Sequence, residues 1–218
     1  MTREELIKKV ALKMDEISSS DDVIVPVGTG DNNPLYTQIN NLLNESVNDA
    51  LMKAPIYRIQ SQVDIIKNII ASNNDILNIG ERKAFIIPVP EDFIRLVSIT
   101  DKAFQRAIVD LSVEGDDVDK RQHNKFLVAK SAKPVAVLGR GESGRTITCY
   151  SYASDANPNP SVKYIKRYDN DTDTTANTDL DAYMVDLVSW VCAGKVFAAQ
   201  GDVTKGKICD ENAAALMV

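Results

Sequence analysis

Apolar side chains recur at three- and four-residue steps near both ends of the chain, which is the spacing of amphipathic helices. Thr2 and Glu5 have the residue types of a capping box, ahead of an apolar series that ends at Ile17. Pro34 suits the first turn of the next helix, and Pro55 ends it because proline disfavours helical geometry in the residue before it. The predicted helices cover residues 2–17, 34–54 and 179–200, which Gly201 terminates, and a last stretch from 202 to 217.

The middle of the chain carries short β-rich runs that are broken by proline and aspartate, and these predict strands. The runs are 84–89, 93–99, 104–109, 125–129, 135–138, 146–150 and 162–168. Their short connections favour an antiparallel sheet. Residues 56–79 fit either a short helix or strands. We therefore expect an α+β fold, mainly a helical bundle with a small antiparallel β-sheet insertion and an N-terminal helical arm.

An acidic connector, residues 19–33, follows the first helix and contains Asp21, Asp22, Asp31, proline and glycine. This composition makes the first helix look detachable, an arm more than a core element. The predicted organisation is an arm with its connector over residues 1–32 and one domain over 33–218. In that domain, helices 34–54 and 179–217 form the core around a β-rich middle at 84–168.

Composition narrows the function classes. The chain has 218 residues, with 25 Lys and Arg against 31 Asp and Glu, a net charge of −6. That balance argues against a general nucleic-acid binder, and we find neither an apolar run of about 18 residues nor a signal-peptide pattern. Cys149, Cys192 and Cys209 are widely spaced, so we expect free buried thiols. With His123 as the single histidine, in a polar stretch, we predict no catalytic residue, cofactor or metal.

Two motifs resemble ligand-binding loops. Gly139, Gly141 and Gly144 have the spacing of a dinucleotide-binding loop, which must open a helix to bind a pyrophosphate. Here an alternating, strand-like run follows, so a hairpin loop is favoured and a nucleotide-dependent enzyme is kept only as a weaker alternative.

The second motif is an acidic series. Asp169, Asp171 and Asp173 match the start of a calcium-binding EF-hand loop. Thr174 and Leu180 stand where that loop needs glycine and a bidentate glutamate. A solvated acidic loop before a helix N-terminus explains the series better.

Charge is strongly segregated in the middle of the chain. Residues 120–145 hold seven basic residues and one acidic residue, and residues 110–119 hold five acidic residues. A solvated sheet face is one explanation; the other is that the two patches meet between subunits of a ring. The candidate subunit-interface residues are Asp116, Asp117, Asp119, Lys125, Lys130, Lys133, Arg140 and Arg145.

The order of several short motifs resembles that of the head–tail connector, or adaptor, proteins of tailed bacteriophages. The segments that carry the resemblance are Leu42–Pro55, a helix that ends in Ala-Pro; Ile87–Val97; Lys133–Leu138; and Tyr183–Met217, with Trp190 in place. The second segment is similar to a family strand through Pro90, Asp92, Phe93 and Arg95, although Phe104 and Ala107 replace a tryptophan and a proline found in relatives. The N-terminal helix and its connector resemble ring proteins of crAss-like phages.

The resemblance implies a non-enzymatic virion structural protein of the neck or tail, assembled in the host cytoplasm. Such proteins form a homo-oligomeric ring, usually a dodecamer, beneath the portal. Their partners are the portal protein and the next tail or ring protein, and DNA passes through the channel without specific binding; no membrane is involved. A hypothesis of another class is a monomeric, non-enzymatic binding module that engages a basic protein partner through its acidic loops.

Overall fold

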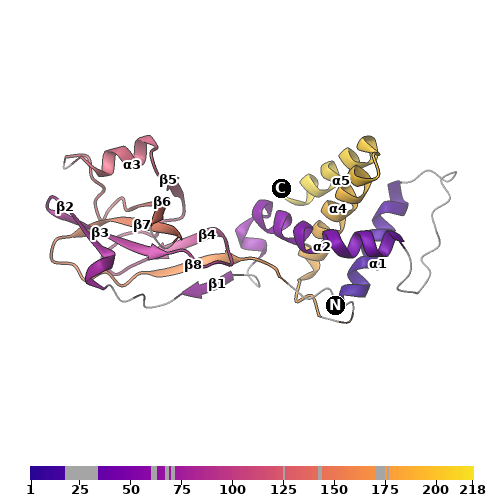
Figure 1. Ribbon diagram of the computed structural model, residues 1–218, viewed down its shortest axis with the longest axis horizontal. Coiled ribbons are helices and arrows are strands. Elements are labelled where there is room, and N and C mark those ends of the chain that lie inside the picture. The colour runs from indigo at the N-terminus through magenta and orange to yellow at the C-terminus, as the bar shows by residue number, and fades with distance from the viewer. Residues whose placement is uncertain are drawn as a thin grey trace. The chain divides into compact units, whose positions relative to one another are not determined.

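The computed structural model describes residues 1–17, 34–59, 63–66, 69, 72–124, 126–141, 144–169, 175 and 177–218. The chain divides into two units, shown in Figure 1. The helical unit comprises Met1–Gln62 and Arg167–Val218, and the β unit comprises Val63–Lys166. The β unit is therefore inserted between two halves of the helical unit. The predicted boundary at residues 32/33 lies outside the described residues, as does the whole acidic connector at 19–33.

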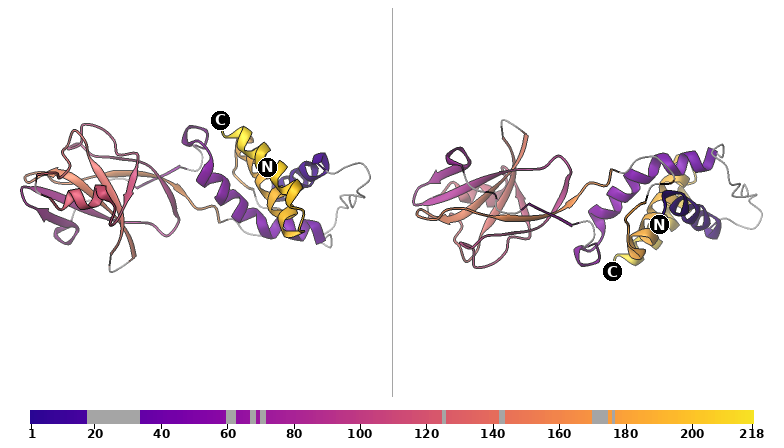
Figure 2. Two further views of the ribbon diagram at one scale, coloured as in Figure 1. Left: turned by 90° about the horizontal axis from the view of Figure 1, so that it is seen from above. Right: turned by 90° about the horizontal axis from the view of Figure 1, so that it is seen from below.

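The helical unit is built around one central apolar helix. Its elements are α1 (Arg3–Ile17), α2 (Pro34–Lys53), the 3₁₀ turn η1 (Ile56–Arg58), α4 (Ala182–Ala199) and α5 (Val203–Leu216). Helix α4 packs against α1, α2 and α5, and the views of Figure 2 show these helices together. The predicted core pair, α2 with α4, is confirmed: Leu43 and Leu187 are both fully buried.

Helix α4 is also long and apolar enough to cross a membrane, by length and composition alone. Most of its residues are buried inside the helical unit. A buried core helix needs the same apolar composition, so this property by itself is not evidence that α4 lies in a membrane.

Helix α1 belongs to the core and is not a detachable arm. The predicted capping box is confirmed, since the Thr2 N–H donates to Glu5 Oε2 at 2.9 Å and the Glu5 N–H donates to Thr2 Oγ1 at 3.3 Å. The wholly buried Arg3 side chain donates to Oδ1 of Asn40 at 2.5 Å and to Oδ1 of Asn44 at 2.8 Å. These bonds tie the start of α1 to α2. The sequence pattern could not reveal this because the partners lie about 40 residues away.

Side-chain and backbone caps set the ends of α4. Asp181 is its N-cap, with a carboxylate that accepts the Met184 N–H at 2.8 Å, so the helix begins three residues later than the predicted position 179. At the other end, the Asp202 N–H bonds to the Phe197 carbonyl at 2.9 Å and the Gly201 N–H to the Ala198 carbonyl at 3.1 Å. This is a Schellman motif, with Gly201 at φ +85°. The predicted terminating role of Gly201 is confirmed.

Gly201→Ala should destabilise the helical unit by about 1–2 kcal/mol, because a side chain is strained at this left-handed φ. Urea unfolding monitored by circular dichroism would measure the loss. Gly201→Asn is the matched control, since asparagine tolerates this conformation better. Equal stability of the alanine variant and the wild type would contradict the Schellman assignment.

The β unit contains two sheets. Its strands are β1 (Val63–Ile66), β2 (Ile76–Ile79), β3 (Arg82–Pro88), β4 (Phe93–Thr100), β5 (Leu111–Val113), β6 (Val135–Gly141), β7 (Gly144–Ala153) and β8 (Ser161–Lys166). The sheet orders are β1-β8-β4 and β2-β3-β7-β6-β5. One apolar cluster draws residues from both sheets, among them Phe85, Ile147, Leu96 and Val162. The two sheets therefore share a core.

The prediction of a mainly helical bundle with a small antiparallel sheet is wrong. The fold is α+β with substantial sheet content, and β5 pairs with β6 in parallel, which makes the five-stranded sheet mixed. A parallel pair needs a crossover, and this one contains α3 (Asp117–Gln122), a helix that the apolar pattern did not predict. Its six residues, Asp-Val-Asp-Lys-Arg-Gln, include a single apolar side chain.

Two predicted strands are also wrong. Residues 104–109 form a loop with one bridge, Ile99 to Ile108, because Asp101 starts a turn by accepting the Ala103 N–H at 2.7 Å. Residues 126–129 follow α3 in turns, since the Asn124 carbonyl accepts the N–H groups of Leu127 and Val128 at 2.9 Å. The ambiguous stretch 56–79 contains η1, β1, the 3₁₀ turn η3 (Asn73–Asp75) and β2.

Candidate subunit-contact surface

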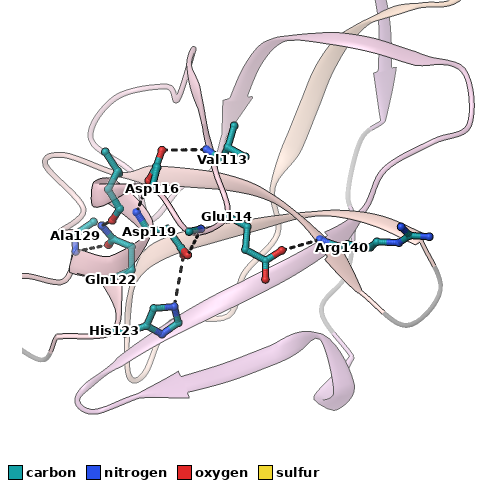
Figure 3. Close-up of polar contacts among 10 residues, drawn as sticks. Val113, Glu114, Asp116, Asp119, Gln122, His123, Ala129 and Arg140 are labelled. Atoms are coloured by element: carbon teal, nitrogen blue, oxygen red, sulfur yellow. Dashed lines mark hydrogen bonds and ion pairs between the residues drawn. The ribbon is translucent and has the colours of Figure 1, made fainter.

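The acidic stretch ahead of the basic residues is organised around the N-terminus of α3. Asp116 is the N-cap of this helix, and its carboxylate accepts the Asp119 N–H at 2.7 Å and the Val113 N–H at 3.1 Å, as Figure 3 shows. The same side chain therefore caps α3 and ties it to the end of β5. Asp116 thus serves the fold of its own subunit.

The pKa of Asp116 is lowered from its ordinary value of 3.8, mainly because the Asp119 N–H bonds to the charged carboxylate. A lowered folded-state pKa contributes stability above pH 3.8 that is lost as the pH falls through the folded pKa. We expect the α3 amide signals in NMR spectra to change below pH 3.8 as the cap protonates. Asp116→Asn is the control, because asparagine caps without titrating. An identical acid transition in that variant would contradict this role.

Asp119 also makes its bonds inside the β unit. Its buried carboxylate accepts the Gly115 N–H at 2.9 Å and lies 3.5 Å from His123 Nε2. Burial raises the pKa of Tyr150 to about 12, and the nearby Asp119 carboxylate adds to that effect. The His123 side chain is exposed, as its polar sequence surroundings favour.

Further bonds hold the chain that runs from α3 to β6. The Gln122 side chain donates to the Val118 carbonyl at 2.8 Å and accepts the Ala129 N–H at 2.9 Å. Glu114 Oε2 accepts the Arg140 N–H at 3.1 Å, which links the end of β5 to β6 (Figure 3). The Gln122 side chain therefore links the end of α3 to Ala129, seven residues further along.

The candidate interface residues separate into two groups. Asp117, Lys130, Lys133 and Arg140 are exposed, and Lys125 lies outside the described residues. Asp116 and Asp119 are occupied by the bonds above. Arg145 also has an internal role, since it donates to the Phe93 carbonyl at 3.3 Å and its guanidinium lies 5.9 Å from the centre of the Phe93 ring.

Sequence reasoning missed the apolar part of this surface. Phe126 is 80% exposed and Leu127 is 59% exposed, directly after α3. The sequence signal was present, because two large apolar residues stand between Lys125 and Lys130. In the predicted strand at 125–129 these two side chains would be half-buried.

The family-motif residues Pro90, Asp92, Phe93 and Arg95 lie at and before β4. The Phe93 N–H bonds to the Pro90 carbonyl at 3.1 Å, and Asp92 accepts the Tyr164 hydroxyl at 3.1 Å. The Phe93 and Tyr164 rings stack with centroids 5.7 Å apart. The motif therefore fastens β4 to β8. In the helical unit, Pro55 follows the end of α2, and Trp190 is half-buried with Lys13 Nζ 4.8 Å from its ring centre.

The remaining chemical groups are sequestered or arranged as structure. All three cysteines are free and buried, as predicted, and burial raises the pKa of Cys192 and of Cys209 to about 11 and that of Cys149 further. The dinucleotide-like glycines lie on the β6–β7 hairpin, with Gly141 opposite Gly144, so the predicted hairpin is confirmed. Asp171 and Asp173 lie outside the described residues. Across the described ranges, no three His, Cys, Asp or Glu side chains are grouped to hold a metal ion.

Comparison with known proteins assigns no family to the chain. No family model matches it, and no curated protein matches it either.

Proposed function

We propose that the chain is a virion structural protein that forms a head–tail connector ring beneath a phage portal. The observation that carries the proposal is the separation of charge between the two units. The helical unit has 18 acidic and 10 basic residues, a net charge of −8, and the β unit has 13 acidic and 15 basic residues, a net charge of +2. A ring needs two different, complementary surfaces on each subunit, and opposite charges favour their pairing.

The partners in this proposal are other copies of the chain, the portal protein and the next tail or ring protein. DNA would pass through the channel without specific binding. The acidic balance supports this part, because strong neutralisation of phosphates would hold the DNA and impede its passage. The motif that carries the family resemblance supports it in another way, since its residues stabilise the β4–β8 pairing on which subunit surfaces would rest.

Assembly on the portal tests the proposal. The full chain would be co-expressed with the portal protein of the same phage genome, and the purified complex examined by negative-stain electron microscopy and light scattering. We expect closed rings with a central channel, dodecameric as the family resemblance implies, seated on the portal. A persistent monomer with the portal present would contradict the proposal and favour the monomeric binding module. A thermal shift with added nucleotide would instead favour the enzyme alternative.

A further inference from the structure

The segment after α3 combines exposed apolar side chains with uniform positive charge. We call residues 120–133 the basic loop; they include five Lys and Arg residues and no Asp or Glu. Phe126 and Leu127 are the exposed apolar pair within it. Aromatic side chains surrounded by cationic residues are typical anchors of protein interfaces, because they bury much area while the charges select the partner.

The exposed apolar pair borders two surface hollows. Phe126, Val128 and Lys130 line a cleft of about 470 Å³ together with the β2–β3 turn at residues 80–82. Leu127 lines a second hollow of about 390 Å³ along α3, beside Lys120 and Arg121. The two apolar side chains therefore border separate hollows, each with two basic residues and one carboxylate in its wall: Glu81 in the first and Asp117 in the second.

Hydrogen bonds within the loop hold its described backbone on both sides of residue 125. Asn124 accepts the Phe126 N–H through Oδ1 and the Leu127 N–H through its carbonyl, both at 2.9 Å. Gln122 fixes the loop further along, at Ala129. A loop that is ordered before binding loses little conformational entropy when it docks, which favours affinity.

The excess of basic residues in the loop favours an acidic partner surface, and the neighbouring acidic stretch is a poor candidate. Within residues 110–119, Glu114, Asp116 and Asp119 bond inside the β unit. Residues 168–194 of the helical unit, by contrast, hold six Asp and no Lys or Arg. Asp169, Asp179 and Asp186 of that stretch are described and exposed.

Other acidic residues of the helical unit are less suitable. Glu45 and Asp49 each lie 2.6 Å from Lys195 Nζ, and Glu16 lies 3.1 Å from Lys13 Nζ. These ion pairs reduce the negative charge available to a partner. Residues 168–194 contain no lysine or arginine, so their exposed aspartates are the better complement to the basic loop.

We propose that the basic loop of one subunit docks, through Phe126 and Leu127, on the helical unit of a second copy at Asp169, Asp179 and Asp186. The contact joins two different surfaces, so each copy offers one free surface of each kind and the contact repeats around a ring. The inference rests on the proposed function, because it names the contact between neighbouring subunits of that ring. In this inference the acidic partner of the basic loop is the helical unit of a second copy, and not residues 110–119 as the charge pattern predicted.

Cross-linking of isotopically distinct copies tests the contact directly. Unlabelled and ¹⁵N-labelled full chains would be mixed at high concentration and low salt, and treated with a carbodiimide that joins a lysine amine to a carboxylate. We expect mixed-label peptides that link Lys120, Lys130 or Lys133 to Asp169, Asp179 or Asp186. Same-label links alone, or no link between these segments, would overturn the inference.

Charge reversal tests whether the contact drives association. We expect Lys130→Glu with Lys133→Glu, or Asp169→Lys with Asp186→Lys, to weaken self-association by about tenfold or more in sedimentation velocity. All four changes in one chain should restore it. Asp179 is left unchanged because its φ of +50° would strain a lysine. Weakening without rescue would overturn the proposed pairing.

The apolar anchor needs its own control. Phe126→Ser should weaken association by about tenfold without lowering thermal stability, because the side chain is exposed. Val109→Ser, at another exposed apolar residue of the β unit, should leave association unchanged. Equal effects of the two variants would overturn the role of Phe126.

The outcomes for the contact and for the connector function are separable. Rings on the portal that tolerate every loop variant would overturn the contact and leave the connector function standing. Mixed-label cross-links without rings on the portal would do the reverse. Co-sedimentation of the chain with phosphatidylglycerol-containing vesicles, abolished by Phe126→Ser and without mixed-label cross-links, would assign the loop to a lipid surface and overturn the contact.

Discussion

Leu187→Asp should abolish the cooperative unfolding transition of the helical unit. Leu187 is fully buried on α4, where α1, α2 and α5 all pack. An aspartate there must enter the core as an unpaired charge or take up a proton, and either costs several kcal/mol. That cost is comparable to the roughly 5–15 kcal/mol that stabilises a typical protein. Thermal melts followed by circular dichroism at 222 nm would reveal the loss.

The equivalent change on α2, Leu43→Asp, should have the same effect, because Leu43 is also fully buried. Leu12→Asp is the matched control: the residue lies on α1 but is 56% exposed, so the variant should melt close to the wild type. Normal melting of either core variant would show that α2 and α4 do not form the core.

The second large effect is expected in the β unit, from Tyr152→Ala. Tyr152 is fully buried, its ring centre lies 4.8 Å from that of Phe104, and its hydroxyl lies 3.4 Å from Asp101 Oδ2. Removing the ring leaves a cavity in the shared core of the two sheets, which costs about 3–5 kcal/mol. Urea unfolding followed by far-ultraviolet circular dichroism, and not by tryptophan fluorescence, would measure the change.

Tyr152→Phe separates the ring from the hydroxyl. It keeps the packing and removes one long hydrogen bond, so we expect a loss of only about 1 kcal/mol. Similar losses in the two variants would mean that the hydroxyl, and not the ring, stabilises this region.

The helices were predictable because their signals are local. The capping box at Thr2, the stop at Pro55 and the Schellman glycine at Gly201 each act within a few residues, and the structure confirms all three. The sheets were less predictable because pairing depends on distant residues. The parallel β5–β6 pair needs α3, whose main sequence signal is its N-cap, Asp116. The pairing of β5 with β6 is visible only in the folded structure, because α3 and its following loop separate the two strands in the sequence.

The candidate surface shows a similar limit. Counting charges placed Asp116 and Asp119 on an interface, but a charge count does not reveal which carboxylates cap helices or accept backbone N–H groups. The exposed pair at Phe126 and Leu127 was hidden for the opposite reason, since apolar residues are assigned to the interior unless the fold shows otherwise. The candidate contact surface is therefore the basic loop, and not the acidic stretch at 110–119 that precedes it.

The insertion of the β unit between α2 and α4 has a consequence for the order of folding. An unstructured loop of about 130 residues between these helices would oppose their packing by about 4 kcal/mol of closure entropy. Pairing of β1 with β8 removes about 1–1.5 kcal/mol of that cost, because Val63 faces Ile165 and the effective loop becomes about fivefold shorter. During synthesis, α1 and α2 must also wait for α4, which emerges after the whole β unit. We therefore expect the β unit to fold first and to set the rate at which the helical unit is completed.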